Sequence, residues 1–301
     1  MANAATISWP RSSAVLELLK PITWFPPMWA FGCGVVSSGA SPLENWAVFA
    51  GGVLLAGPMV CGASQAVNDW FDRHVDAINE PNRPIPSGRI PGQWGLFIAI
   101  AWSALSLLLG AALGPWALLA TAFGLALAWA YSAPPFRLKQ NGWLGNAACG
   151  LCYEGLPWIT AVAVMTAAAP DWRIAVVALL YSVGAHGIMT LNDFKSIGGD
   201  TAMGVRSLPV RLGPRNAAWV ACFMMAWPQA IVIEMLAAWG AWTNALVVAG
   251  LLLAQIALMR RFLAAPLERA VWFSGFGVLL YVLGMLVAAF ALRGLTAGAG
   301  A

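Results

Sequence analysis

The sequence predicts an all-α integral membrane protein, a nine-transmembrane-helix bundle with a central cavity open to the cytoplasmic side. Of its 301 residues, 60% are hydrophobic and only 9% are charged, and the mean hydropathy is +0.75. A soluble globular protein carries about 25% charged residues. The apolar stretches are close to the length of a membrane-spanning helix and lack the alternation of a membrane β-barrel.

Nine apolar segments give the predicted helix count. They cover residues 22–39, 45–67, 94–112, 115–132, 145–167, 173–192, 216–238, 241–259 and 271–291. The first twenty residues are mixed and polar, without the apolar core of a signal peptide. We therefore expect residues 1–20 to form a cytoplasmic N-terminal segment, residues 21–292 one nine-helix domain, and residues 293–301 a short C-terminal tail.

Charge predicts the orientation of these helices. Fourteen of the sixteen Lys and Arg residues lie in the N-terminal segment or in the loops after even-numbered helices, and only Arg173 and Arg293 lie on the other side. Basic residues concentrate in cytoplasmic loops. The N-terminus is therefore expected in the cytoplasm and the C-terminus in the periplasm. The net charge of +4 reflects this asymmetry and predicts no nucleic-acid partner.

An acidic cluster follows the second apolar segment. Asp69, Asp72 and Asp76 are spaced i, i+3 and i+7, which predicts that all three lie on one face of a helix. Like charges this close repel one another unless a cation lies between them. Carboxylate oxygens suit Mg²⁺, which keeps coordination positions free for substrate phosphates. A single acid here is commonly a helix cap, but three on one face indicate a metal site.

A second acidic group, Asp193 and Asp200, follows the sixth apolar segment on the same side of the membrane. Further polar side chains on that side are expected to bind phosphate oxygens: Asn68, Arg83, Arg137, Lys139, Lys195 and Arg206. All five acids are expected to be catalytic and to bind metal. Acids for metal and bases for phosphate together predict a Mg²⁺–diphosphate pocket.

Two ionisable residues lie deeper, within predicted helices. Glu154 lies in 145–167 and His186 in 173–192. Such residues usually face a cavity and are functional candidates, so we expect both to contact the acceptor substrate. The alternatives are an interhelical hydrogen bond for His186 and a neutral or paired Glu154.

Three motifs together resemble the UbiA superfamily of intramembrane prenyltransferases. They are Asn68-Asp69-x2-Asp72-x3-Asp76, Tyr131-Ser132-x-Pro134-Pro135-x-Arg137-x-Lys139, and the segment from Asn192-Asp193 to Asp200. The resemblance spans nearly the whole chain. Within the superfamily the chain is most similar to chlorophyll and bacteriochlorophyll synthases, through residues 20–27, 77–88 and 192–196.

The resemblance implies a Mg²⁺-dependent enzyme that transfers a geranylgeranyl or phytyl chain from its diphosphate to the propionate carboxylate of bacteriochlorophyllide, releasing diphosphate. It also implies a place in bacteriochlorophyll biosynthesis and photosynthesis, in a bacterial inner membrane (cytoplasmic or intracytoplasmic), alongside other pigment-biosynthesis membrane proteins. One position departs from the family's second motif. Ser196 and Gly198 stand where acids are common, and Asp193 is expected to supply the missing ligand.

Two other functions stay open on the residues alone. A prenyltransferase acting on a quinone precursor or on haem would need the same diphosphate pocket. A transporter for a divalent cation or an anion could also use clustered acids. Transporters, however, bind their substrates near the bilayer midplane, whereas the charges here gather at one surface.

Overall fold

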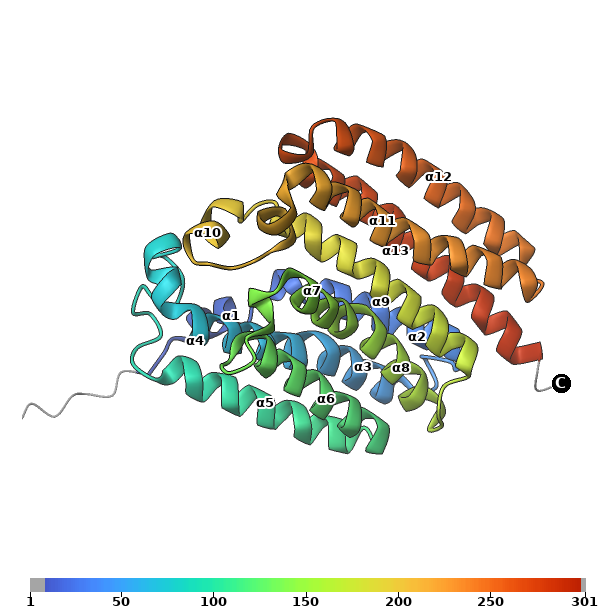
Figure 1. Cartoon of the computed structure of the whole chain (residues 1–301). Coiled ribbons are helices and arrows are strands. Elements are labelled where there is room, and N and C mark those ends of the chain that lie inside the picture. Colours follow the sequence, from blue (N-terminus) through green and yellow to red (C-terminus); the bar gives the residue numbers. More distant parts are fainter. Residues whose placement is uncertain (1–8, 299–301) are drawn as a thin grey trace, which may run out of the picture.

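The computed structural model describes residues 9–298, and most of them are helical (Figure 1). Within these residues the only β pairing is an isolated bridge between Asn141 and Arg206. The α-helices, in chain order, are α1 (Ser12–Leu18), α2 (Phe25–Ser38), α3 (Trp46–Leu54), α4 (Gly62–Asn79), α5 (Trp94–Ala112), α6 (Pro115–Ser132), α7 (Gly142–Gly150), α8 (Leu156–Thr166), α9 (Trp172–Asp193), α10 (Ile197–Ala202), α11 (Leu208–Ala238), α12 (Trp242–Ala264) and α13 (Pro266–Gly298).

Eight helical stretches in residues 9–298 are long and apolar enough to cross a membrane. They are Trp46–Asn79, Trp94–Ala112, Pro115–Ser132, Gly142–Thr166, Trp172–Asp193, Leu208–Ala238, Trp242–Ala264 and Pro266–Leu295. The chain is therefore an all-helical, multi-pass membrane protein, as predicted. The first predicted segment is helix α2, which has 14 residues. A membrane crossing takes about 20 residues, so α2 is shorter than the other eight stretches.

Two of these stretches contain a π-helical turn that joins two α-helices. Leu55–Cys61 joins α3 to α4, and Leu151–Gly155 joins α7 to α8. Pro58 lies in the first π turn, where it has no N–H to donate, and its carbonyl accepts a hydrogen bond from the Trp102 indole at 3.0 Å. A π turn widens the helix locally and is frequently found at functional sites. Both π turns lie beside the cavities described below.

The largest hydrophobic core lies mainly in the C-terminal half of the bundle. The main hydrophobic core joins α9, α11, α12 and α13 to α2 and α8. Its centre includes the stacked rings of Phe262 and Phe273, 5.1 Å apart, and Tyr281, whose hydroxyl donates to the Tyr181 carbonyl. A smaller core joins α1, α4 and α5. The cavities are lined mainly by α4, α6, α7 and the two π turns.

Two helices begin at polar caps. Asn141 Oδ1 accepts a hydrogen bond from the Trp143 amide at the start of α7. Asp171 accepts from the Arg173 amide at 2.8 Å at the start of α9, and its carboxylate also accepts from the Arg173 guanidinium. This contact with Arg173 lowers the pKa of Asp171. Such caps satisfy backbone N–H groups that have no partner in the first helical turn.

Figure 1 places α1, α10 and the C-terminal end of α4 at one end of the bundle, and the C-terminal end of α13 at the other. The predicted N-terminal segment contains helix α1. Arg293, predicted to start a tail, is instead inside α13, because the helix continues to Gly298. The helix thus extends past residue 293, and the division of the chain into domains stays a prediction. Residues 1–8 and 299–301, which belong to the predicted N-terminal segment and tail, lie outside the described residues.

Candidate active site

A polar cavity of about 610 Å³ lies at the end of the bundle that carries α10. Its walls come from α4, the loop that follows α6, the first turns of α7, and α10. Nine of the thirteen side chains expected from the sequence to form the site line it: Asn68, Asp72, Asp76, Arg83, Arg137, Lys139, Asp193, Lys195 and Asp200. Segments far apart in the chain therefore meet around one space.

Two of the three acids that were predicted to share a face of α4 line the cavity. Asn68, Asp72 and Asp76, spaced by four residues, line the cavity, and Asp69 does not. Asp69 is only 1% exposed, and its carboxylate lies 2.6 Å from the ammonium of Lys20. With 3.6 residues per turn, Asp69 lies only about 20° from Asp76 around the helix axis, and both carboxylates contact Arg83. The three acids therefore lie on one side of α4, with Asp69 buried beside the cavity, and a metal role for Asp69 stays a prediction.

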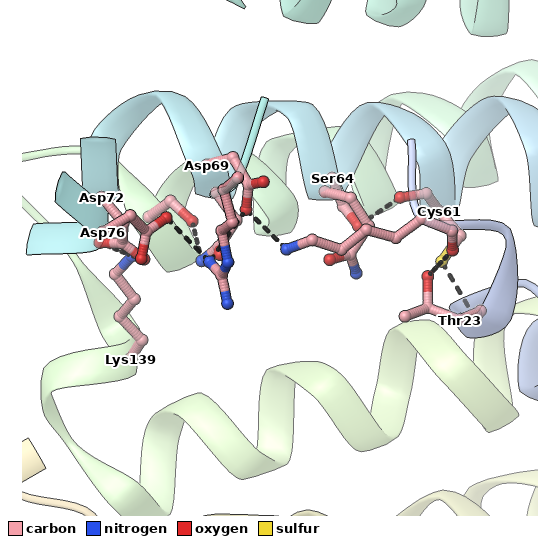
Figure 2. A network of polar contacts seen from close by, with 12 residues as sticks. Thr23, Cys61, Ser64, Asp69, Asp72, Asp76 and Lys139 are labelled. Carbon is pink, nitrogen blue, oxygen red and sulfur yellow. Dashed lines mark hydrogen bonds and ion pairs between the residues drawn. The ribbon is translucent and has the colours of Figure 1, made fainter. Parts of the chain in front are cut away.

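Basic side chains pair with the carboxylates of α4 (Figure 2). The Lys139 ammonium lies 2.6 Å from each carboxylate oxygen of Asp72, and the Arg137 guanidinium lies 3.4 Å from one of them. Arg83 donates to Asp76 at 2.8 Å and lies 3.5 Å from Asp69. The acids of α4 thus already have cationic partners.

The pKa values of two of these bases are shifted in opposite directions. Burial lowers the pKa of Lys139, and the charge of Asp72 offsets part of that effect. Burial also acts to lower the pKa of Arg83, but the nearby carboxylates of Asp69 and Asp76 outweigh it and raise the pKa above its usual value. Of the two side chains, Lys139 therefore gives up its proton more readily.

The second acidic group reaches the cavity from α9 and α10. Asp193 accepts a hydrogen bond from the Asn146 amide at 3.1 Å, and Asn146 also donates to Thr190. The Ser196 hydroxyl donates to Asp200 at 3.0 Å. Ser196 therefore contacts an acid of the motif as a hydrogen-bond donor.

Across residues 9–298 no three His, Cys, Asp or Glu side chains lie close enough to hold a metal ion by themselves. The acids are instead distributed over the walls of the polar cavity, with oxygen ligands on α4, α9 and α10. Mg²⁺ is commonly bound by one or two carboxylates together with substrate phosphates and water. These residues fit a Mg²⁺ ion that arrives with a phosphate group.

An apolar cavity of about 230 Å³ adjoins the polar one, and Asn68 and Tyr131 line both. Its walls include Pro27, Leu127 and Met189. A third cavity of about 40 Å³ lies beyond it and reaches Phe31 and Thr121. The three cavities lie in series, so a ligand with a charged head and an apolar tail fits the arrangement.

Three of the thirteen expected side chains, besides Asp69, lie outside the lining of these cavities. Arg206 is exposed, and its backbone pairs with Gln140 and Gly142 at the rim. Glu154 is 3% exposed and lies near Cys33 and Tyr281, in the main core. His186 is 4% exposed and packs against Trp143. Neither Glu154 nor His186 lines one of the three cavities, and their contact with the acceptor stays a prediction.

The structure also adds side chains that the sequence reasoning did not assign to the site. Tyr131 stands at the junction of the two larger cavities, Asn146 holds Asp193, and Lys20 holds Asp69. Tyr131 and Lys20 both belong to the motifs that carried the resemblance, so their place in those motifs was an available signal. Asn146 lies in an apolar segment, where an amide itself indicates a buried polar contact.

Comparison with known proteins agrees with this geometry. The model of the UbiA prenyltransferase family matches residues 23–273. The chain is 58% identical over 286 residues to the bacteriochlorophyll synthase 33 kDa chain of Cereibacter sphaeroides, and 55% identical over 290 residues to that of Rhodobacter capsulatus; each match covers 95% of both chains. The fold is similar to that of a UbiA homolog from Archaeoglobus fulgidus bound to DMAPP and Mg²⁺, with a TM-score of 0.68, 20% identity, and 90% and 98% of the two chains covered. The chain therefore belongs to the UbiA prenyltransferase family.

Proposed function

We propose that this protein is a bacteriochlorophyll synthase that transfers a geranylgeranyl or phytyl chain from its diphosphate to the propionate carboxylate of bacteriochlorophyllide. The observation that carries the proposal is the 58% identity to a bacteriochlorophyll synthase chain over 95% of both proteins. The series of one polar and two apolar cavities supports it, because an allylic diphosphate has a charged head and an apolar tail.

In the proposed reaction, the bond between the first carbon of the prenyl chain and the diphosphate oxygen breaks, and the diphosphate leaves with the electron pair. A propionate oxygen forms the new ester bond to that carbon. The propionate is ionised near neutral pH, so the reaction needs no general base. This agrees with the polar cavity, whose lining carries acids and bases suited to phosphate and metal but no His.

Lys139, Arg137 and Arg83 are placed to take up the negative charge that develops on the leaving diphosphate. Asn68, Asp72, Asp76, Asp193 and Asp200 would hold Mg²⁺, which when bound neutralises part of the diphosphate charge. The apolar cavity beyond Tyr131 keeps water from the reacting carbon. Asp69, held by Lys20 and Arg83, positions α4 and has no direct part in binding the metal.

The direct test uses membranes that contain the protein. Incubation with Mg²⁺, geranylgeranyl diphosphate and bacteriochlorophyllide should yield an esterified pigment, separable from the free acid by chromatography. Phytyl diphosphate in parallel reveals the donor preference. Formation of no pigment ester with either donor, while a quinone precursor or haem becomes prenylated, would reject the proposed acceptor and leave the family assignment intact.

A blocked acceptor tests the nucleophile. Bacteriochlorophyllide whose propionate is already a methyl ester has no free carboxylate and should give no product. It should compete with free bacteriochlorophyllide, because its macrocycle is unchanged. An enzyme that prenylates an aromatic carbon would be indifferent to the state of the propionate.

We further propose that α2 crosses the membrane as a ninth, short helix and that the polar cavity opens to the cytoplasm. The charge distribution supports this orientation. In a variant freed of its five native cysteines, Ser87→Cys should react with a membrane-impermeant maleimide only from the cytoplasmic side, and Gly294→Cys only from the periplasmic side. Both positions are exposed. Labelling of both from one side would contradict an odd number of crossings.

A further inference from the structure

Gly124, on α6, lies where the outer apolar cavity meets the inner one. It lines both cavities, together with Ala56, Val60 and Cys152. The outer cavity begins next to the polar cavity, whereas the inner one ends at Phe31 and Thr121, deeper in the bundle. A prenyl chain that enters from the diphosphate end must pass Gly124 to reach the inner cavity.

The absence of a side chain at position 124 keeps this passage open. A Cβ added to Gly124 would lie 3.1 Å from a Leu156 methyl and 3.8 Å from a Val60 methyl. Val60 belongs to the π turn between α3 and α4, and Leu156 begins α8 directly after the other π turn. Val60 in one π turn and Leu156 directly after the other therefore lie at the same constriction, with Gly124 opposite them.

We infer that Gly124 determines the length of prenyl chain that this enzyme accepts, by controlling access to the inner cavity. The inference rests on the proposed function, in which the donor's tail occupies the apolar cavities. A short tail fits within the outer cavity of about 230 Å³ and does not need the passage. A longer tail continues past Gly124 toward Phe31, and any side chain at position 124 competes for that space.

A graded series tests this inference. Wild type, Gly124→Ala and Gly124→Val are each assayed in detergent with Mg²⁺, bacteriochlorophyllide and, in turn, geranyl, farnesyl and geranylgeranyl diphosphate. We expect kcat/KM for geranylgeranyl diphosphate to fall modestly in Gly124→Ala and at least about tenfold in Gly124→Val. We expect kcat/KM for geranyl diphosphate to change by less than about twofold.

A second substitution across the constriction provides a rescue. Val60→Ala removes methyl groups from the side chain that faces Gly124, so Gly124→Val with Val60→Ala nearly conserves the total volume. The double variant should regain most of the activity with geranylgeranyl diphosphate. Overpacking that damaged the fold would also be relieved by the smaller residue at position 60, but it would lower kcat/KM for geranyl diphosphate in Gly124→Val as well.

Gly250 is the matched control. It lies on α12, it is exposed, and a Cβ added there meets no atom within 4 Å. Gly250→Val should preserve the wild-type order of the three donors. Equal losses with all three donors in Gly124→Val, or no loss with any, would overturn the inference. If wild type esterified no pigment with any donor, the proposed function would fail instead, so the two failures are distinguishable.

Discussion

The ammonium of Lys139 lies 2.6 Å from both carboxylate oxygens of Asp72, at the wall of the polar cavity. The two residues come from elements 67 positions apart in sequence, α4 and the loop after α6. Asp72 is a proposed metal ligand and Lys139 a proposed phosphate ligand, so their contact marks where metal and diphosphate meet.

Asp72→Asn should lower turnover at least about tenfold, equivalent to roughly 1.4 kcal/mol of activation barrier, because a neutral amide is a weaker Mg²⁺ ligand. The variant should also need more Mg²⁺ for half-maximal rate. Initial rates over a Mg²⁺ titration measure both effects. Glu44→Gln, which removes an exposed acid outside the site, serves as the control. Wild-type rates for Asp72→Asn at low Mg²⁺ would reject a metal role for Asp72.

Asp69→Asn should behave differently from Asp72→Asn, since Asp69 pairs with Lys20 and Arg83 and does not line the cavity. We expect a lower melting temperature, with a stability loss of about 1–3 kcal/mol, because Lys20 and Arg83 lose the buried carboxylate that pairs with them. The Mg²⁺ concentration for half-maximal rate should stay unchanged. Thermal unfolding in detergent and the same Mg²⁺ titration separate the two roles. A rise in the Mg²⁺ requirement equal to that of Asp72→Asn would make Asp69 a ligand after all.

In the second motif, Asp193→Asn and Asp200→Asn should each reduce turnover strongly, whereas Ser196→Ala should stay within about threefold of wild type. The Ser196 hydroxyl donates to Asp200, and a neutral hydroxyl is a poor substitute for a carboxylate toward Mg²⁺. The three variants are compared by kcat at saturating substrates. Should Ser196→Ala be as damaging as Asp200→Asn, Ser196 would have to be an essential part of the metal site.

Asp171 gives a pH prediction on the opposite side of the bundle. Its pKa is lowered by Arg173, so its contribution to stability is full above its unfolded pKa of about 3.9 and is lost as the pH falls through its folded pKa. Asp171→Ala should cost about 1 kcal/mol near pH 7 through loss of the cap of α9. Melting temperatures from pH 7 to pH 3 should show this difference shrinking. Asp171→Asn keeps a capping oxygen, and should lie closer to wild type at pH 7.

Glu154→Gln should change KM for either substrate by less than about twofold, because Glu154 lies near Cys33 and Tyr281 and lines none of the three cavities. Steady-state kinetics with the pigment and the prenyl diphosphate varied in turn give the two KM values. A selective rise in KM for the pigment would support the sequence-based expectation that Glu154 contacts the acceptor.

Hydropathy and motif spacing were sufficient to predict the membrane class, most of the helices, and nine of the residues around the polar cavity. Those residues were predictable because helical spacing and the types of charged residue can both be read from the sequence. The burial of Asp69 was not predictable in the same way. Spacing fixes which residues share a face, but only packing against Lys20 and Arg83 decides that Asp69 is buried and Asn68 faces the cavity.

Residues within the membrane helices show the same limit of prediction from sequence. A buried acid such as Glu154 indicates a special environment from sequence alone, yet its direction depends on where neighbouring helices lie. The π turns are equally hidden, because Pro58 predicts a disturbed helix but not a widened turn that carries Val60 to the passage. The role of Gly124 depends on that geometry and has no signature in the sequence.

The pairing of acids and bases along α4 has a consequence for ligand binding. Asp69, Asp72 and Asp76 are matched by Lys20, Arg83, Arg137 and Lys139 before any substrate arrives. Under the proposed function, a metal diphosphate would enter by ion exchange: Lys139 would leave a carboxylate for a phosphate, and Asp72 would leave an ammonium for the metal. The affinity for the metal diphosphate would then depend on the difference in free energy between the ion pairs within the protein and those formed with the ligand. These ion pairs balance the charges of the α4 acids at the edge of a membrane, where an uncompensated charge is costly.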